Sequence, residues 1–139
     1  MEYELLEHEA DIGIRGYGNT IEEAFENGAK AMFSVMIDLE TVESEKNVEI
    51  KCEAPDIEAL FVEWLNELLT KKDIEEMSFS RFKVKIYKDD IYKLEGTASG
   101  EKFDQKKHKA KLEVKGATYS GLKIGKKDEK IFIQCIVDV

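Results

Sequence analysis

The fold is decided first by the stretch His8-Glu9-Ala10-Asp11-Ile12-Gly13-Ile14, where one apolar segment ends and a second begins. Residues 3–8 are predicted to form a strand, and residues 11–17 a second strand with Ile12 and Ile14 on one face. Gly16 and Gly18 are expected to break this second strand. Whether Asp11 is a metal ligand, a partner contact or a turn residue depends on which other segments the fold brings beside it.

Two helices are predicted after these strands. Thr20 can cap the first helix, Glu23 completes a capping box, and apolar residues at helical spacing continue the helix to about residue 37. Asp56 can cap the second helix. That helix carries the most regular amphipathic pattern in the chain: Ile57, Leu60, Phe61, Trp64, Leu65, Leu68 and Leu69. Such stripes are typical of helices that pack on a core.

Strands account for the remaining pattern. Apolar and polar residues alternate over residues 48–52 and 82–86, and Asp89-Asp90 separates the latter from residues 91–96 as in a hairpin. Further strands are predicted over 109–114, 121–124 and 131–137, with a turn at 125–128. This order predicts an α+β fold, with two amphipathic helices on a mostly antiparallel sheet, in a compact single domain over residues 1–139.

The charge balance restricts the class of partner. The chain has 30 acidic and 21 basic residues, which give a formal net charge of −9. Such a field repels phosphate backbones, so it disfavours direct nucleic-acid binding and favours cations or a basic protein partner. No apolar run is long enough to span a bilayer and the first residues are acidic, so we expect a cytoplasmic protein without a membrane partner.

Few residues other than carboxylates offer reactive chemistry. Cys52 and Cys135 each lie in an apolar run and are expected to be reduced core residues, and no spacing of paired ligands favours zinc. The sequence has no Gly-x-Ser-x-Gly motif, P-loop or dinucleotide fingerprint. His8 and His108 are too isolated to predict a catalytic triad.

The carboxylate hypothesis joins the two ends of the chain. Asp11 opens the second predicted strand, and Asp138 directly follows the apolar last strand. If these strands lie near each other, both side chains can converge with the terminal carboxylate of Val139. Three hard oxygen donors suit Ca²⁺ or Mg²⁺ better than zinc. The alternative is that each aspartate is only a turn or solvated residue.

A second polar region follows residue 99. It contains Gly100, Glu101, Phe103, Asp104 and His108, and continues through residues 113–119. Its mixture of glycines and polar side chains is typical of an exposed functional loop, or simply of a charged connection between two strands. The residues alone assign it no reaction.

The sequence resembles the archease family in blocks spread over nearly the whole chain. The matching blocks are His8–Ile14, Ala24–Asn27, Ala31–Met36, Trp64–Leu69, Gly100–Asp104, His108, Glu113–Tyr119 and Val137–Val139. The resemblance implies a compact α+β domain related to the strand-helix-strand-strand module. It also implies a part in tRNA splicing, as accessory protein of the RNA ligase that joins a 3′-phosphate or cyclic-phosphate end to a 5′-hydroxyl end.

The resemblance further implies a mechanism and a site. Family members promote guanylylation of the ligase by GTP and so support multiple turnover. Their carboxylate metal site, carried over to this sequence, falls on Asp11, Asp138 and the terminal carboxylate of Val139. The chain departs from the family pattern at Glu9, where Thr is frequent, and also at Gly116 and Ser120, where Ala and His are frequent. Because this chain has Ser120 there, we assign no role to a histidine at that position.

We therefore expect a non-enzymatic activator of the GTP-dependent tRNA-splicing RNA ligase. Its cofactor would be a divalent cation, calcium in the first place, with magnesium or manganese as alternatives. The predicted partner contacts or supporting groups are His8, Glu9, Asp104, His108 and Lys115. Two alternatives stay open: a metal-dependent enzyme acting on a phosphorylated small molecule, and a chaperone-like module for RNA-modifying proteins.

Overall fold

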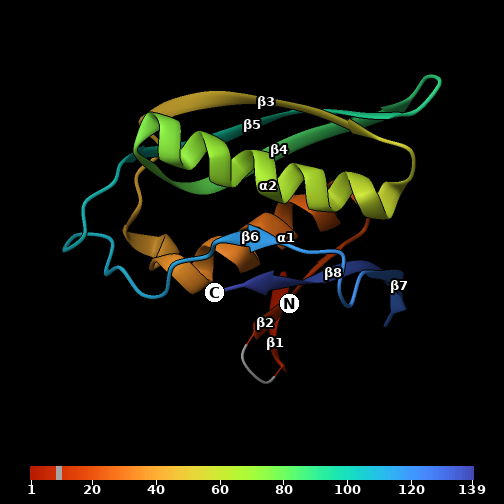
Figure 1. The fold of residues 1–139 in the computed structure, drawn as a ribbon, viewed down its shortest axis with the longest axis horizontal. Coiled ribbons are helices and arrows are strands. Elements are labelled where there is room, and N and C mark those ends of the chain that lie inside the picture. The colour runs from red at the N-terminus through yellow and green to blue at the C-terminus, as the bar shows by residue number, and fades with distance from the viewer. Residues whose placement is uncertain (9–10) are drawn as a thin grey trace.

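The first of two antiparallel sheets joins the beginning of the chain to its end (Figure 1). The structure, a computed structural model, describes residues 1–8 and 11–139. The strands of this sheet are β1 (Tyr3–His8), β2 (Asp11–Gly18), β6 (Gly116–Ala117), β7 (Lys123–Lys127) and β8 (Lys130–Asp138). Their order is β1-β2-β8-β6, and β7 also pairs with β8. The last strand of the chain therefore lies beside the second.

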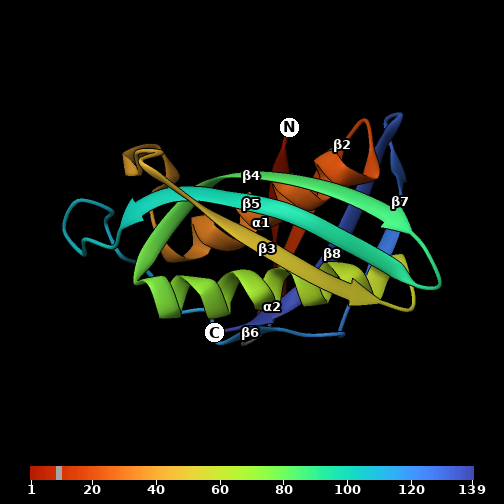
Figure 2. The same cartoon turned by 90° about the horizontal axis from the view of Figure 1, so that it is seen from above.

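The second sheet contains the middle strands of the chain. They are β3 (Lys46–Ala54), β4 (Met77–Lys88) and β5 (Tyr92–Lys102), in the order β3-β5-β4. β4 and β5 form the predicted hairpin, whose ladder runs from Lys88↔Tyr92 to Met77↔Lys102. Figure 2 shows these three strands as a layer crossing over both helices.

The helices are α1 (Ile21–Met36) and α2 (Ile57–Glu75), with a short 3-10 turn at η1 (Leu39–Thr41). Both predicted N-caps are confirmed, because Thr20 accepts the Glu23 N–H at 3.1 Å and Asp56 accepts the Ala59 N–H at 2.7 Å. Among the described residues, no helix combines the length and the apolar character that a membrane crossing needs.

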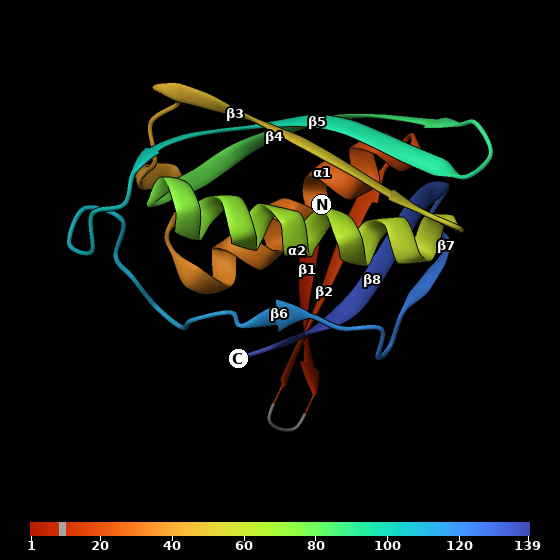
Figure 3. The same cartoon turned by 45° about the horizontal axis from the view of Figure 1, so that its top comes forward.

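Both helices lie between the two sheets (Figures 1 and 3). α1 packs on β2 and β4, and α2 packs on β3 and β6. This position explains why the buried arc of α2 is wide; its buried residues are Leu60, Phe61, Val62, Trp64, Leu65, Leu68 and Leu69. Burial of neighbouring positions such as 60, 61 and 62 is expected where a helix is covered on two sides.

The α+β class and the two amphipathic helices are confirmed, but the strands form two sheets where the sequence analysis expected one. The predicted strand over 109–114 is wrong, since this segment has no regular structure. Lys111 and Leu112 instead donate their backbone N–H groups to Met36 O at 2.8 Å and Val35 O at 3.3 Å. The segment therefore satisfies carbonyls at the end of α1, which a helix leaves without intrahelical partners.

Two boundaries also differ from the predictions, and both involve glycine. β2 continues through Gly16, where a Cβ would lie 2.2 Å from Ala24 O; the missing side chain lets α1 approach the strand. Gly125 lies inside β7, and the turn that follows uses Asp128 and Glu129 with φ of 52° and 64°. Two consecutive positive φ angles are typical of a type I′ hairpin turn.

Candidate functional site

The predicted carboxylates lie at the paired ends of β2 and β8. The ladder between these strands begins at Ile12↔Val137 and runs to Gly18↔Ile131. Continued by one residue, the same register places Asp11 opposite Asp138. Directly opposed residues of an antiparallel pair share a face, with Cβ atoms about 4.5–5.5 Å apart. The backbone therefore meets the condition that the sequence analysis set, which is that the two strands are neighbours. The convergence of the side chains on a metal stays a prediction.

The register also determines which face carries the two aspartates. Ile14 and Cys135 oppose each other and are 0% and 1% exposed, so their side chains belong to the core face. Asp11 and Asp138 have the opposite parity along their strands and therefore lie on the outer face, away from the helices. Asp138 is exposed and Asp11 is half-buried, so solvent and a partner can reach this end of the sheet.

The third predicted ligand follows Asp138 directly, and its position is held from the other side by β6. Gly116 opposes Asp138, and the Lys115 N–H donates to Asp138 O at 2.7 Å. The Val139 side chain is half-buried against the core. Lys115, one of the predicted supporting residues, is thus brought beside the site through its backbone.

The positively charged side chain nearest along β2, Arg15, has partners other than the two aspartates. Arg15 donates from Nε to Gln134 Oε1 at 2.8 Å, and its guanidinium lies 4.3 Å from the centroid of the Phe132 ring. Among the side chains that the structure describes, no ion pair engages Asp11 or Asp138. The predicted donors, two carboxylates and the terminal carboxylate of Val139, would form an all-oxygen anionic set, whose chemistry fits a hard divalent cation.

Two predicted residues at the turn are described in part or not at all. The backbone of His8 opposes Asp11 in the ladder between β1 and β2. The His8 side chain and Glu9 lie outside what the structure describes. Their predicted roles as contacts or supporting groups stay predictions.

The other predicted histidine belongs to an internal network. His108 is fully buried; its Nδ1 accepts the Asp104 N–H at 3.0 Å and its Nε2 lies 2.9 Å from Glu101 Oε2. Since Nδ1 accepts, the ring proton is on Nε2 and is donated to Glu101. Ser78 Oγ also lies 3.2 Å from Nδ1. His108 therefore presents no surface to a partner and instead anchors the connection after β5.

Asp104 has a similar local role, although it is exposed. Its Oδ1 accepts the backbone N–H groups of Lys106 and Lys107, each at 3.0 Å. These bonds, the one from Lys107 first, lower the pKa of the Asp104 carboxyl. The carboxylate thus orders the turn that delivers His108 into the interior.

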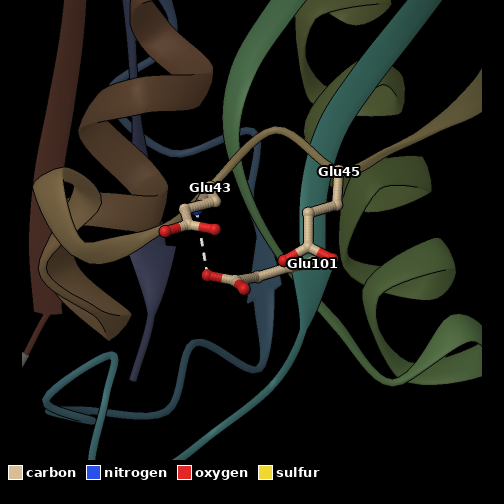
Figure 4. Close-up of side chains that lie close together, drawn as sticks. All are labelled: Glu43, Glu45 and Glu101. Atoms are coloured by element: carbon tan, nitrogen blue, oxygen red, sulfur yellow. Dashed lines mark hydrogen bonds between the residues drawn. The ribbon is translucent and has the colours of Figure 1, made fainter.

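A carboxylate cluster that the sequence analysis did not find lies beside this network. Glu43, Glu45 and Glu101 each place an oxygen within 4.8 Å of the others, and Figure 4 shows the three side chains converging from the segment before β3 and from β5. Glu101 accepts the Glu43 N–H at 2.9 Å, and Lys107 Nζ lies 2.9 Å from Glu101. The Lys107 ammonium group therefore offsets part of the negative charge of this cluster.

These contacts explain the titration of Glu101. The Glu43 N–H, His108 and Lys107 together lower the pKa of the Glu101 carboxyl from its ordinary 4.5 to about 2. The hydrogen bond with Glu101 in turn raises the pKa of Lys107. No sequence signal could have found the cluster, because Glu43 and Glu101 belong to segments that only tertiary packing brings together. We interpret it as an ion-pair network that holds the connection after β5.

The comparison with known families decides the identity. The model of the Archease protein family (MTH1598/TM1083) matches residues 3–139. The chain belongs to the archease family. It is 46% identical to the protein archease of Pyrococcus furiosus over 140 residues, which cover 99% of each chain. It is 44% identical to the protein archease of Sulfurisphaera tokodaii over 137 residues, 99% of this chain and 98% of that one.

Solved archease structures share the fold. The solution structure of Methanobacterium thermoautotrophicum protein 1598 superposes with a TM-score of 0.87 at 40% identity and covers 99% of both chains. The crystal structure of an archease from Thermotoga maritima, described as a possible chaperone, has a TM-score of 0.60 and covers 96% of this chain and 94% of that one. At 18% identity the Thermotoga structure supports the fold alone. The family resemblance noted from the sequence is confirmed, and the names of these relatives state no catalytic activity.

Proposed function

We propose that this archease is a non-enzymatic activator of the GTP-dependent tRNA-splicing RNA ligase, which promotes guanylylation of the ligase by GTP and thereby its multiple turnover. The observation that carries the proposal is the register of β2 and β8. Its ladder reaches Ile12↔Val137 and, continued by one residue, places Asp11 opposite Asp138 on the outer face of the sheet. Family membership supports the choice of partner.

In this proposal Asp11, Asp138 and the terminal carboxylate of Val139 hold a divalent cation. Calcium is the first choice because it accepts several carboxylate oxygens in flexible geometry, and magnesium or manganese are the alternatives. When bound, the cation supplies positive charge that can offset the negative charge of nucleotide phosphates. The chain's own contribution would be to bind and orient it at the paired ends of β2 and β8.

The placement of the carboxylates favours action on a partner over action inside this protein. They lie on the outer face of the sheet, where Asp138 is exposed, so a second protein can approach them directly. The net charge of −9 would steer this protein towards a basic surface, as an RNA-binding enzyme presents around its substrate.

The test is a guanylylation assay of the cognate ligase with GTP. We expect this archease to increase GMP transfer, Asp11→Asn and Asp138→Asn to abolish most of the increase, and chelation to act on the wild type in the same way. Asp90→Asn, at the exposed tip of the β4–β5 hairpin, is the matched control and should retain full activity. Full stimulation by both folded site variants would refute the proposal.

The same preparation separates the alternatives. Turnover of a nucleotide by the purified protein without ligase would instead favour a metal-dependent enzyme. Recovery of RNA-modifying enzymes but not the ligase in pull-downs would favour a chaperone-like module. Tight, salt-sensitive binding to naked tRNA would contradict the expectation from the net charge.

A further inference from the structure

Asn66 forms a two-way hydrogen bond with the backbone of one residue of β6. Its Oδ1 accepts the Ala117 N–H at 2.8 Å, and its Nδ2 donates to Ala117 O at 3.1 Å. The side-chain amide thus satisfies both backbone groups of Ala117, as a neighbouring strand would do. Asn66 lies on α2, half-buried, so these bonds tie the helix layer to the edge of the first sheet.

β6 in turn holds the end of β8. Gly116 opposes Asp138, Ala117 opposes Val137, and the Lys115 N–H donates to Asp138 O at 2.7 Å. A strand of two residues has few ladder bonds of its own, so its position depends on what supports its other edge. On that edge, the bonds to the backbone of β6 come from the Asn66 amide of α2.

We propose that Asn66 is a positioning residue for the carboxylate site. It acts through β6: the amide holds Ala117, the Gly116–Ala117 strand holds the backbone of Asp138, and that backbone sets where the Asp138 side chain and the Val139 carboxylate lie. The inference rests on the proposed metal site, and it assigns a part in that site to a helix residue whose side-chain amide bonds to Ala117.

Asparagine is the residue type that this position requires. A short amide carries one donor and one acceptor at the spacing of a backbone N–H and C=O. Aspartate could accept from the Ala117 N–H but would face Ala117 O with a second acceptor, and an aliphatic side chain would leave both groups without a partner. Loss of a group that hydrogen-bonds to a metal ligand typically lowers metal affinity 10–100-fold. Asn66 acts one strand further away, so we expect the lower end of this range.

The chain offers a matched control in Asn27. This residue lies on α1, is 8% exposed, and donates from Nδ2 to Tyr17 O at 2.7 Å. It therefore also ties a helix to the backbone of a strand of the same sheet. The bond falls near the opposite end of β2 from Asp11, so its loss should reduce stability without moving the carboxylates.

The experiment is calorimetric titration of the purified, metal-free protein with Ca²⁺ alone. We expect Asn66→Ala to weaken Ca²⁺ binding about tenfold. Asn27→Ala should lower the melting temperature but leave the Ca²⁺ affinity unchanged. Amide hydrogen exchange at Lys115 should become faster in Asn66→Ala and not in Asn27→Ala. Asn66→Gln keeps the amide on a longer side chain and should bind Ca²⁺ with intermediate affinity; it also replaces the alanine variant if that fails to fold.

The outcomes separate this inference from the proposed function. If the wild type binds Ca²⁺ and the folded Asn66 variants bind it equally well, the positioning role is refuted while the metal site stands. If the wild type binds none of Ca²⁺, Mg²⁺ or Mn²⁺, the metal site itself is refuted and the inference falls with it. An equal loss of affinity in the Asn27 and Asn66 variants would show a general effect of stability and would also refute the positioning role.

Discussion

Trp64 on α2 donates its indole N–H to Phe25 O on α1 at 3.0 Å, and both residues are fully buried. The bond connects the two helices inside the layer that separates the sheets. It satisfies the one polar atom of the largest side chain in the core, since a buried indole N–H without a partner is costly.

Replacing Trp64 by Phe should therefore destabilise the protein by about 2 kcal/mol, through the lost hydrogen bond and the space left by the smaller ring. Trp64 is the only tryptophan, so urea unfolding should be followed by circular dichroism. A variant as stable as the wild type would mean that the core closes around the smaller side chain.

Replacing Glu26 on α1 by glutamine and by alanine should change the stability of the protein in different ways. Its carboxylate accepts the Val84 N–H at 3.0 Å, while burial raises its pKa above the ordinary 4.5 despite this bond. A raised carboxyl pKa means that the charged form costs stability as the pH rises through the titration. We expect Glu26→Gln, which can still accept from Val84, to be at least as stable as the wild type at pH 7, with the advantage vanishing in acid.

Glu26→Ala is the counterpart, because it leaves the Val84 N–H without its partner. It should lower the free energy of unfolding by about 1–2 kcal/mol, measured by urea titration at the same pH. Equal stability of the glutamine and alanine variants would show that the Val84 bond contributes nothing.

Glu101 should govern part of the acid stability. Its folded pKa of about 2 lies below the ordinary 4.5, so its contribution is complete above about pH 4.5 and is lost as the pH falls towards 2. The melting temperature of Glu101→Gln should therefore lie below that of the wild type at neutral pH, and the two should converge between pH 4.5 and 2. Glu45→Gln, at an exposed position of the same cluster, should show a smaller effect at every pH.

Calcium should raise the melting temperature only when the carboxylate site is intact. A ligand that binds only the folded state, at a concentration of about 100 times its Kd, adds about 2.7 kcal/mol to the free energy of unfolding. We expect this shift in the wild type and in Asp90→Asn, and its loss in Asp11→Asn and Asp138→Asn. Differential scanning fluorimetry with and without Ca²⁺ provides the measurement, and an equal shift in all four proteins would place the cation elsewhere.

Local signals predicted most of the elements well. The caps at Thr20 and Asp56 and the apolar stripe through Trp64 are encoded within a few residues, so both helices could be placed from the sequence. The segment 109–114 could not, because its alternation is compatible with a strand while its backbone bonds go to the end of α1. A period of two predicts which side chains share a face, but not which segment lies alongside.

The candidate site shows the same division. The sequence by itself determined that carboxylates stand where β2 begins and β8 ends, and the family blocks around them determined the family. Only the tertiary structure decided that β8 lies beside β2, in a register that opposes Ile12 to Val137 next to the two aspartates. It also decided that His108 is buried and that Glu43, Glu45 and Glu101 meet. The physical reason is that strand neighbours are chosen by how two sheets close over the helices between them, and that choice depends on contacts between residues far apart in the chain.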